Sequence, residues 1–265
     1  MPPMRALLAQ FASIPGRPAD NAATLADVVS ANTDIDLVVT PELFLTGYDM
    51  STVRELAIDA DGPEIARIRA AAASSGTAAV VGFAERRGDN PANSLALIDA
   101  RGNLVAVYRK VQLFGNEAVN FEPGERLVVA ELARRRIGAM ICFDVEFPEV
   151  ARALAKAGAD LLVTASANMA PFFDDHLLAT RARALDNHLP HLYTNRVGSE
   201  GGYDFVGGTR AISSSGRVQA EIAGSAQDVL VVDVPARGVA DNRVDYLKYV
   251  RDPVAVDYHR TATGA

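Results

Sequence analysis

The stretch Ile137-Gly-Ala-Met-Ile-Cys142-Phe-Asp-Val-Glu-Phe-Pro-Glu149 decides how the rest of the chain is interpreted. An apolar run typical of a buried strand ends on the only cysteine in the protein. A turn follows, and Pro148 then opens a helix, where its fixed φ and missing N–H are tolerated. The pattern predicts a thiol exposed at a strand-to-helix elbow, with backbone N–H groups beyond it that can bind an anion.

Cys142 has two interpretations at this point. A free cysteine is most often a small buried hydrophobe. The elbow instead suits a nucleophile that must hold a developing oxyanion, because backbone donors stabilise that charge. The stretch alone leaves the two interpretations even, so the decision depends on other parts of the chain.

Composition limits the class of protein. The 265 residues suffice for one large domain or two small ones. A net charge of -7, with Arg134-Arg135-Arg136 as the only basic run, argues against a nucleic-acid partner. No stretch approaches 18 uncharged apolar residues, so no membrane span is expected. A single cysteine and an N-terminus without signal-peptide order predict a cytoplasmic protein without an internal disulfide.

Helical and strand patterns are mixed along the whole chain. Asp20 is expected to cap the first helix, and Arg101-Gly102-Asn103 is expected to turn two strands into an antiparallel hairpin. Helices covering sheets of mixed direction therefore fit better than a purely parallel sheet. We expect helices over 21–32, 63–75, 149–157 and 176–187, and strands over 5–11, 36–40, 78–83, 94–98, 105–108, 127–130, 137–142, 160–164, 191–195, 209–213, 218–222 and 229–234.

The domain organisation is predicted to be simple. No internal repeat, low-complexity segment or long linker divides the chain, so residues 1–265 are expected to form a single domain. Residues 240–265 mix Tyr, Arg and Asp without a clear period. We expect them to form a C-terminal extension that packs on a partner subunit.

Three predicted strands end on a lone reactive group, namely Glu42, Lys110 and Cys142. Strand ends at one edge of a sheet can bring distant residues together. A thiol with a pKa of roughly 8.5 is mostly protonated near neutral pH, so a carboxylate is needed to take its proton. An ammonium can then stabilise the thiolate and a tetrahedral oxyanion. Each residue alone could equally be a cap or a solvated strand end.

Other kinds of site are poorly supported. No HExxH spacing, second cysteine or Gly-x-Ser-x-Gly elbow is present, so no metal and no cofactor are expected. A cysteine–histidine dyad stays open, although no histidine has a context that favours it. Gly201-Gly202 and Gly207-Gly208 are expected to give loop flexibility around Tyr203-Asp204. The histidines are His176, His188, His191 and His259.

Three blocks of the chain resemble the signatures of the nitrilase, or carbon–nitrogen hydrolase, superfamily. They are Pro41-Glu42-Leu-Phe-Leu-Thr-Gly-Tyr48, Tyr108-Arg-Lys110-Val-Gln-Leu-Phe-Gly115 and Ile141-Cys142-Phe-Asp-Val-Glu-Phe-Pro-Glu149. The resemblance runs in the family's order from the first strand to about Val234. It implies a four-layer α-β-β-α sandwich and a triad in which Glu42 is the general base, Lys110 stabilises the oxyanion and Cys142 is the nucleophile.

The resemblance implies further site residues. Glu117 matches a second glutamate of the family, which could orient Lys110 or position substrate and water; a solvated loop carboxylate is the alternative. The backbone N–H of Phe143 would be the second oxyanion donor, and Tyr48 belongs to the first block. Asn168 lies in Ser166-Ala-Asn-Met169, which resembles the amidase branch. Family relatives usually assemble, so a homo-oligomer, dimeric or larger, is implied.

The branch of the family decides the reaction. Phe143-Asp144 stands where family nitrilases usually have Trp-Glu, and Val145-Glu146 stands where carbamoyl-amide hydrolases tend to carry a basic residue. The amidase branch includes hydrolases of short amino-acid amides such as 5-aminopentanamide. We therefore expect a cofactor-free amidase that acts on a small-molecule amide through a thioester. A nitrilase or N-carbamoyl amide hydrolase is the alternative; a non-catalytic scaffold fits less well, because all three reactive residues are intact.

The substrate is expected to carry a free amine. Acidic residues lie near the site in sequence, and a carboxylate close to a bound ammonium favours it in a water-poor pocket. Surface charges on an acidic protein are the alternative. The acidic residues are Glu146, Asp174, Asp175 and Asp204, and the cations that would hold a carboxylate-bearing amide instead are Arg181, Arg183 and Arg196.

Overall fold

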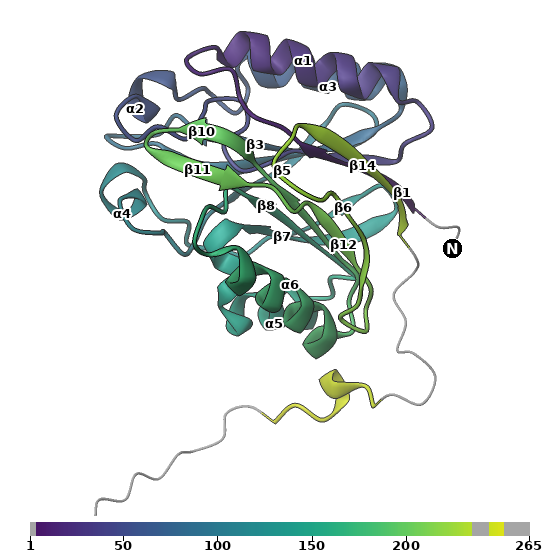
Figure 1. The fold of residues 1–265 in the computed structure, drawn as a ribbon. Coiled ribbons are helices and arrows are strands. Elements are labelled where there is room, and N and C mark those ends of the chain that lie inside the picture. Colours follow the sequence, from purple (N-terminus) through teal and green to yellow (C-terminus); the bar gives the residue numbers. More distant parts are fainter. Residues whose placement is uncertain (1–3, 235–243, 252–265) are drawn as a thin grey trace, which may run out of the picture.

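Two six-stranded β-sheets stack face to face, and a pair of helices covers the outer face of each (Figure 1). This arrangement is seen in a computed structural model that describes residues 4–234 and 244–251. The layers follow the order helix, sheet, sheet, helix. The predicted four-layer α-β-β-α sandwich is therefore confirmed.

The first sheet joins the beginning of the described chain to its last strand. Its central strands β1, β2 and β3 are parallel, and the flanking strands pair antiparallel. Helices α1 (Pro18–Ala31) and α3 (Pro63–Ser75) cover its outer face. In sheet order the strands are β14 (Asp228–Val234), β1 (Met4–Gln10), β2 (Leu37–Val39), β3 (Ala78–Glu85), β4 (Ala92–Ile98) and β5 (Leu104–Arg109).

The second sheet repeats this plan. Its central strands β7, β8 and β9 are parallel, and antiparallel strands flank them. Helices α5 (Pro148–Lys156) and α6 (Phe173–Asn187) cover its outer face. In sheet order the strands are β13 (Val218–Glu221), β12 (Arg210–Ile212), β9 (His191–Asn195), β8 (Leu161–Ser166), β7 (Arg135–Ile141) and β6 (Val129–Leu132).

The main hydrophobic core lies between the two sheets. Leu8 and Val39 face it from the first sheet, and Ile141 and Val163 face it from the second. The alternate residues of the same strands, such as Val38 in β2, pack under the outer helices. Central strands are therefore buried on both faces, which is why β3 is apolar along most of its length.

Some expectations for local structure were wrong. Gly201 and Gly202 form the turn of a hairpin between β10 (Val197–Glu200) and β11 (Tyr203–Val206), where flexible loop was expected. Both glycines have positive φ, which a tight hairpin turn requires. Helix α1 has Arg17 at its N-cap with no side-chain cap, so Asp20 lies in the first turn instead of capping it. Short helices α2 (Val53–Leu56), α4 (Glu117–Asn120), η1 (Cys142–Glu146) and η2 (Tyr246–Lys248) were not expected.

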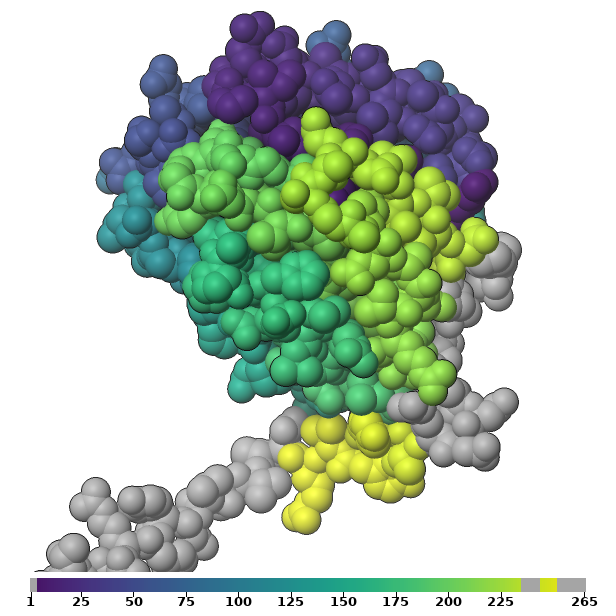
Figure 2. Space-filling model, in the orientation of Figure 1, coloured from purple at the N-terminus to yellow at the C-terminus, as the bar shows by residue number. Residues whose placement is uncertain are grey.

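Residues 244–251 lie below the layer formed by α5 and α6 (yellow in Figures 1 and 2). His188 Nε2 is 2.8 Å from the Val244 carbonyl oxygen, and the Tyr246 ring lies 4.8 Å from the His188 ring. The rest of the predicted extension, residues 240–243 and 252–265, lies outside the described residues. Its packing on a partner stays a prediction.

Candidate active site

The side chains that follow β2 and β5 meet in one buried ionic cluster. Lys110 Nζ lies 2.7 Å from Glu42 Oε1 and 2.7 Å from Glu117 Oε2. None of the three side chains is more than 1% exposed. The structure therefore brings Glu42, Lys110 and Glu117 together as expected from their positions. The alternative of a solvated loop carboxylate at Glu117 is wrong.

Asn93 on β4 bridges the two glutamates and was not predicted from the sequence. Its Nδ2 donates to Glu42 Oε1 at 2.7 Å and to Glu117 Oε1 at 3.3 Å. The main-chain N–H of Ala167 donates to Glu42 Oε2 at 2.8 Å. Glu42 therefore has a fixed orientation, and an Oε2 lone pair is left to accept a proton.

Glu117 is fixed from its other side. Tyr48 donates its hydroxyl proton to Glu117 Oε1 at 2.9 Å, and the Phe114 N–H donates to Oε2 at 2.8 Å. Glu117 also begins α4, where a carboxylate interacts favourably with the helix N-terminus. Tyr48 thus contacts Glu117, and a direct role in substrate binding stays a prediction.

Cys142 follows β7 directly and has a left-handed backbone conformation, with φ of 43°. A non-glycine residue in this region is strained and is held there by its surroundings. Asp144 supplies part of that restraint, because its Oδ2 accepts hydrogen bonds from the Ile141 N–H at 2.8 Å and the Tyr108 hydroxyl at 2.6 Å. Cys142 is 8% exposed, so the prediction of an exposed thiol is wrong.

Burial keeps the resting site uncharged at the sulfur. Desolvation raises the pKa of the Cys142 thiol well above its ordinary value, and the nearby Glu42 carboxylate raises it further. Desolvation also raises the pKa of Glu42 to about 7, although the Lys110 ammonium acts in the opposite direction. Near neutral pH an ionised Glu42 can therefore accept a proton from a neutral thiol.

Lys110 keeps its charge in this buried position. Burial opposes the ammonium, but the carboxylates of Glu117 and Glu42 outweigh it and raise the pKa of Lys110. One cation between two carboxylates gives a cluster that can hold a negative charge or share a proton. The ammonium within this cluster is the group that can stabilise a buried oxyanion.

The cavity at Cys142 is narrow and mainly apolar, with about 10 Å³ of free volume. The Phe114 ring packs edge-on against Phe143 at 5.4 Å and against Phe172 at 5.6 Å. Phe143, Glu146 and Asn168 lie in its wall, and their role in substrate binding stays a prediction. The full lining is Phe114, Cys142, Phe143, Glu146, Asn168, Met169, Phe172 and His176.

The other predicted binding residues are placed elsewhere. Asp174, Asp175 and Asp204 are exposed and do not line the cavity, so Glu146 alone of the acidic residues faces it. The arginines do not line it either: Arg183 donates to the Val145 carbonyl, and Arg196 is buried in an ion pair with Glu200.

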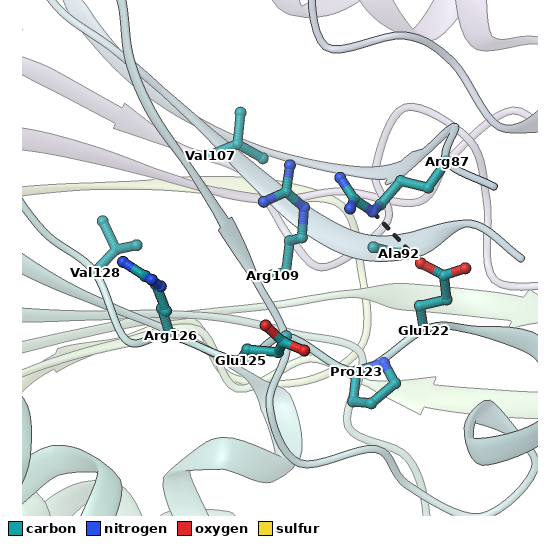
Figure 3. Close-up of a pocket in the computed structure, with 10 residues that line it drawn as sticks. Arg87, Ala92, Val107, Arg109, Glu122, Pro123, Glu125, Arg126 and Val128 are labelled. Atoms are coloured by element: carbon teal, nitrogen blue, oxygen red, sulfur yellow. Dashed lines mark ion pairs between the residues drawn. The ribbon is translucent and has the colours of Figure 1, made fainter.

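A larger cavity of about 340 Å³ lies beside Arg109, the last residue of β5 (Figure 3). Arg87, Arg109 and Arg126 face it, together with Glu122. Arg87 pairs with Glu122 at 3.5 Å and Arg109 with Glu85 at 2.6 Å, so its charges are largely balanced. It contains none of the residues around Cys142.

Residues 4–234 and 244–251 contain neither a metal-binding cluster nor a membrane-spanning helix. No group of three His, Cys, Asp or Glu side chains there could hold a metal ion. No helix within those ranges is long and apolar enough to cross a membrane.

Comparison with known proteins places this geometry in a family. The sequence pattern of the family described as Carbon-nitrogen hydrolase matches residues 7–243. The chain belongs to the carbon–nitrogen hydrolase family. It is therefore a hydrolase of carbon–nitrogen bonds other than peptide bonds, and the resemblance seen in the three sequence blocks is confirmed.

Relatives of this carbon–nitrogen hydrolase include amidases and nitrilases. An (R)-stereoselective amidase from Pseudomonas sp. is 33% identical over 92% of this chain and 90% of its own. A nitrilase from Pyrococcus abyssi is 35% identical over 80% of this chain and 81% of its own. The crystal structure of an amidase from Nesterenkonia sp. superposes with a TM-score of 0.84, with 32% identity and 94% of both chains covered. A mutant of that amidase shows covalent addition of the acetamide moiety of fluoroacetamide at its active-site cysteine.

Proposed function

We propose that this carbon–nitrogen hydrolase is an amidase that converts a small linear amide to a carboxylate and ammonia through a thioester on Cys142. The observation that carries the proposal is the buried cluster of Glu42, Lys110 and Glu117, whose charges act directly on the Cys142 sulfur. The named relatives and the covalently modified Nesterenkonia amidase support the same chemistry.

In the first half-reaction Glu42 takes the thiol proton as the sulfur attacks the amide carbon. The carbonyl oxygen becomes an oxyanion, which the Lys110 ammonium and the Phe143 N–H stabilise. Removing one such donor typically costs about 10²–10³ in rate. When the tetrahedral intermediate collapses, the C–N bond breaks, and Glu42 returns the proton to the leaving nitrogen, which departs as ammonia.

In the second half-reaction water attacks the thioester carbon. Glu42 takes one water proton, a second oxyanion forms at the same donors, and the C–S bond breaks. The proton then passes from Glu42 to the sulfur, and the product leaves as the carboxylic acid, which gives up its remaining proton in water to become the carboxylate. Glu117 keeps Lys110 in place through both steps, with Tyr48 and Asn93 restraining the two carboxylates.

The nucleophile can be tested by replacing Cys142 with Ala. Ammonia release should fall to background while the melting temperature stays close to that of the wild type, because only one small side chain is removed. Cys142→Ser should be nearly inactive as well, since a hydroxyl ionises much less readily than a thiol. Activity near the wild-type level in a folded Cys142→Ala protein would overturn the proposal.

We also propose that the substrate is small and carries an amine. The narrow cavity favours a short acyl group, and Glu146 is its one acidic wall residue among those described. Of two amides of equal length, one ending in an amine and one in a carboxylate, the amine should have the higher kcat/KM. Glu146→Gln should narrow the gap, whereas the control Asp204→Asn, at an exposed position, should not. Preference for the carboxylate would contradict this assignment.

Nitrile hydrolysis is a second candidate, because the relative from Pyrococcus abyssi is named a nitrilase. A nitrile carbon can be attacked by the same thiol with the same base. A panel of amides, nitriles and N-carbamoyl amides with one acyl group, assayed for ammonia, separates these reactions. We expect the amide to be the fastest substrate.

We further propose a cytoplasmic homo-oligomer, a dimer or larger, built from single-domain subunits. The location is supported by a single cysteine whose function requires a reduced thiol. Assembly is supported by exposed apolar side chains in the segment after the sandwich, with Tyr249 72% and Val244 55% exposed.

A further inference from the structure

A chain of hydrogen bonds leads from Glu146 in the cavity wall to Ser166, which lies beside the Cys142 nucleophile. Glu146 Oε1 lies 3.1 Å from His176 Nε2, and His176 Nδ1 lies 2.9 Å from the Tyr193 hydroxyl. The Tyr193 hydroxyl lies 3.0 Å from Ser166 Oγ, and the parallel pairing of β7 with β8, which sets Ile141 opposite Ala165, places Ser166 beside Cys142. Burial raises the pKa of the Cys142 thiol, and the Ser166 side chain acts in the opposite direction. His176, Tyr193 and Ser166 are at most 2% exposed, so water does not replace these contacts.

The direction of the bond at Ser166 follows from its other partners. Ser166 Oγ accepts from the Tyr193 hydroxyl at 3.0 Å and from the Asn168 N–H at 3.2 Å. A hydroxyl oxygen has two lone pairs and one proton. With both lone pairs engaged, the Ser166 proton is left to donate, and the Cys142 sulfur receives it.

The direction then passes back to His176. Because Tyr193 donates its only proton to Ser166, its oxygen accepts from Nδ1–H of His176. Glu146 Oε1 lies 3.1 Å from the other ring nitrogen, Nε2, and holds the ring on that side.

We infer that His176 is a positioning residue for the nucleophile: held by Glu146, it aligns the hydroxyls of Tyr193 and Ser166 so that Ser166 donates a hydrogen bond to the Cys142 thiolate. The inference rests on the proposed role of Cys142 as the nucleophile. It differs from a cysteine–histidine dyad, because two hydroxyls separate the ring from the sulfur and Glu42 takes the proton. The thiolate-stabilising direction depends on the Nδ1–H of His176, which donates to the Tyr193 oxygen and leaves the Tyr193 proton for Ser166.

This arrangement adds a donor that the buried ionic cluster lacks. Lys110 stabilises the thiolate from the side of the glutamates. Ser166 stabilises it from β8, the strand that pairs with β7. Hydrogen bonds to charged groups contribute more than neutral ones. Loss of the Ser166 donation should therefore lower thiolate formation measurably while the cluster stays intact.

The test measures Cys142 alkylation by iodoacetamide in the absence of substrate, at one pH, in folded variants. Ser166→Ala and Tyr193→Phe should each lower the second-order rate constant by about tenfold. His176→Leu should do the same. His176→Asn, which keeps an amide nitrogen near the Nδ1 position, should recover most of the rate. In amide turnover the same variants should lower kcat and leave KM nearly unchanged.

His191 provides a matched control. It is a buried histidine hydrogen-bonded to Thr164 on the same strand as Ser166, at 2.8 Å, but it has no bond toward the cysteine. Burial lowers its pKa to about 4, so it is neutral. His191→Asn should lower the melting temperature without changing the alkylation rate.

The outcomes separate this inference from the proposed function. Equal alkylation rates in wild type, Tyr193→Phe and His176→Leu would overturn the positioning role, even if Cys142→Ala is inactive. Equal losses in His176→Leu and His176→Asn would also overturn it, because a purely steric role does not distinguish leucine from asparagine. An active Cys142→Ala protein would instead overturn the proposed function.

Discussion

Glu42 is the residue whose ionisation should limit activity at low pH. Its buried carboxyl has a pKa raised to about 7, and only the ionised form can accept the thiol proton. We therefore expect kcat/KM to fall as the pH drops through about 7, and to show no thiol ionisation up to pH 9, because the pKa of Cys142 is raised well above its ordinary value. A pH profile from 5 to 9 checks this. A midpoint near 4.5, the ordinary glutamate value, would contradict the assignment.

Asn93 should tune that ionisation. Its hydrogen bond to Glu42 favours the charged carboxylate and lowers the pKa. Asn93→Ala removes the bond, so the acid limb of the profile should move to higher pH, and activity at pH 6 should fall severalfold. The same profile recorded for Asn93→Asp should move further in that direction, since a third carboxylate adds repulsion. An unchanged midpoint in both variants would remove Asn93 from the site.

At the scale of elements, the site depends on how closely β3 approaches the loop that carries Glu42. A Cβ added at Gly82 would overlap the Pro41 carbonyl oxygen and lie 2.8 Å from the Leu43 nitrogen. Gly82→Ala should therefore move this loop, destabilise the fold by about 1–3 kcal/mol and lower kcat at least tenfold. Urea unfolding and ammonia release measure the two effects.

Gly88→Ala is the control for that substitution. A Cβ at Gly88 lies 3.6 Å from a flexible glutamate side chain, which is ordinary contact. We expect wild-type stability and activity for this variant. Equal behaviour of the Gly82 and Gly88 variants would show that the close approach at β3 does not position Glu42.

At the scale of the whole molecule, the segment after the sandwich is the part whose role depends on a second subunit. Ending the chain at Val234 should lower the molecular mass measured by light scattering to that of a monomer, if residues 240–265 pack on a partner. Tyr249→Ser is the matching point variant. Its side chain is 72% exposed, so the substitution should weaken assembly without unfolding the subunit. An unchanged mass in the truncated protein would reject this role.

The sequence by itself determined the elements and the reactive residues. The pattern of hydrophobic residues predicted the ends of most strands and helices to within two or three residues of their observed bounds, because central strands buried on both faces have continuous apolar runs. Complementary chemistry at three strand ends made Glu42, Lys110 and Cys142 candidates, and the resemblance of three sequence blocks to the carbon–nitrogen hydrolase signatures selected them. The hairpin at Gly201-Gly202 was missed, because turn glycines and flexible glycines have the same local signal.

Only the tertiary structure decided which residues touch. Asn93 joins the site because β4 lies beside β3 in the sheet, and no local pattern distinguishes it from other strand asparagines. Ser166 lies beside Cys142 because parallel pairing sets Ile141 opposite Ala165. His176 contacts Tyr193 only because α6 packs on β9. Burial likewise raised the pKa of Glu42, since desolvation depends on the surrounding layers. Residue chemistry is local and readable, whereas contact and desolvation are properties of the assembled layers.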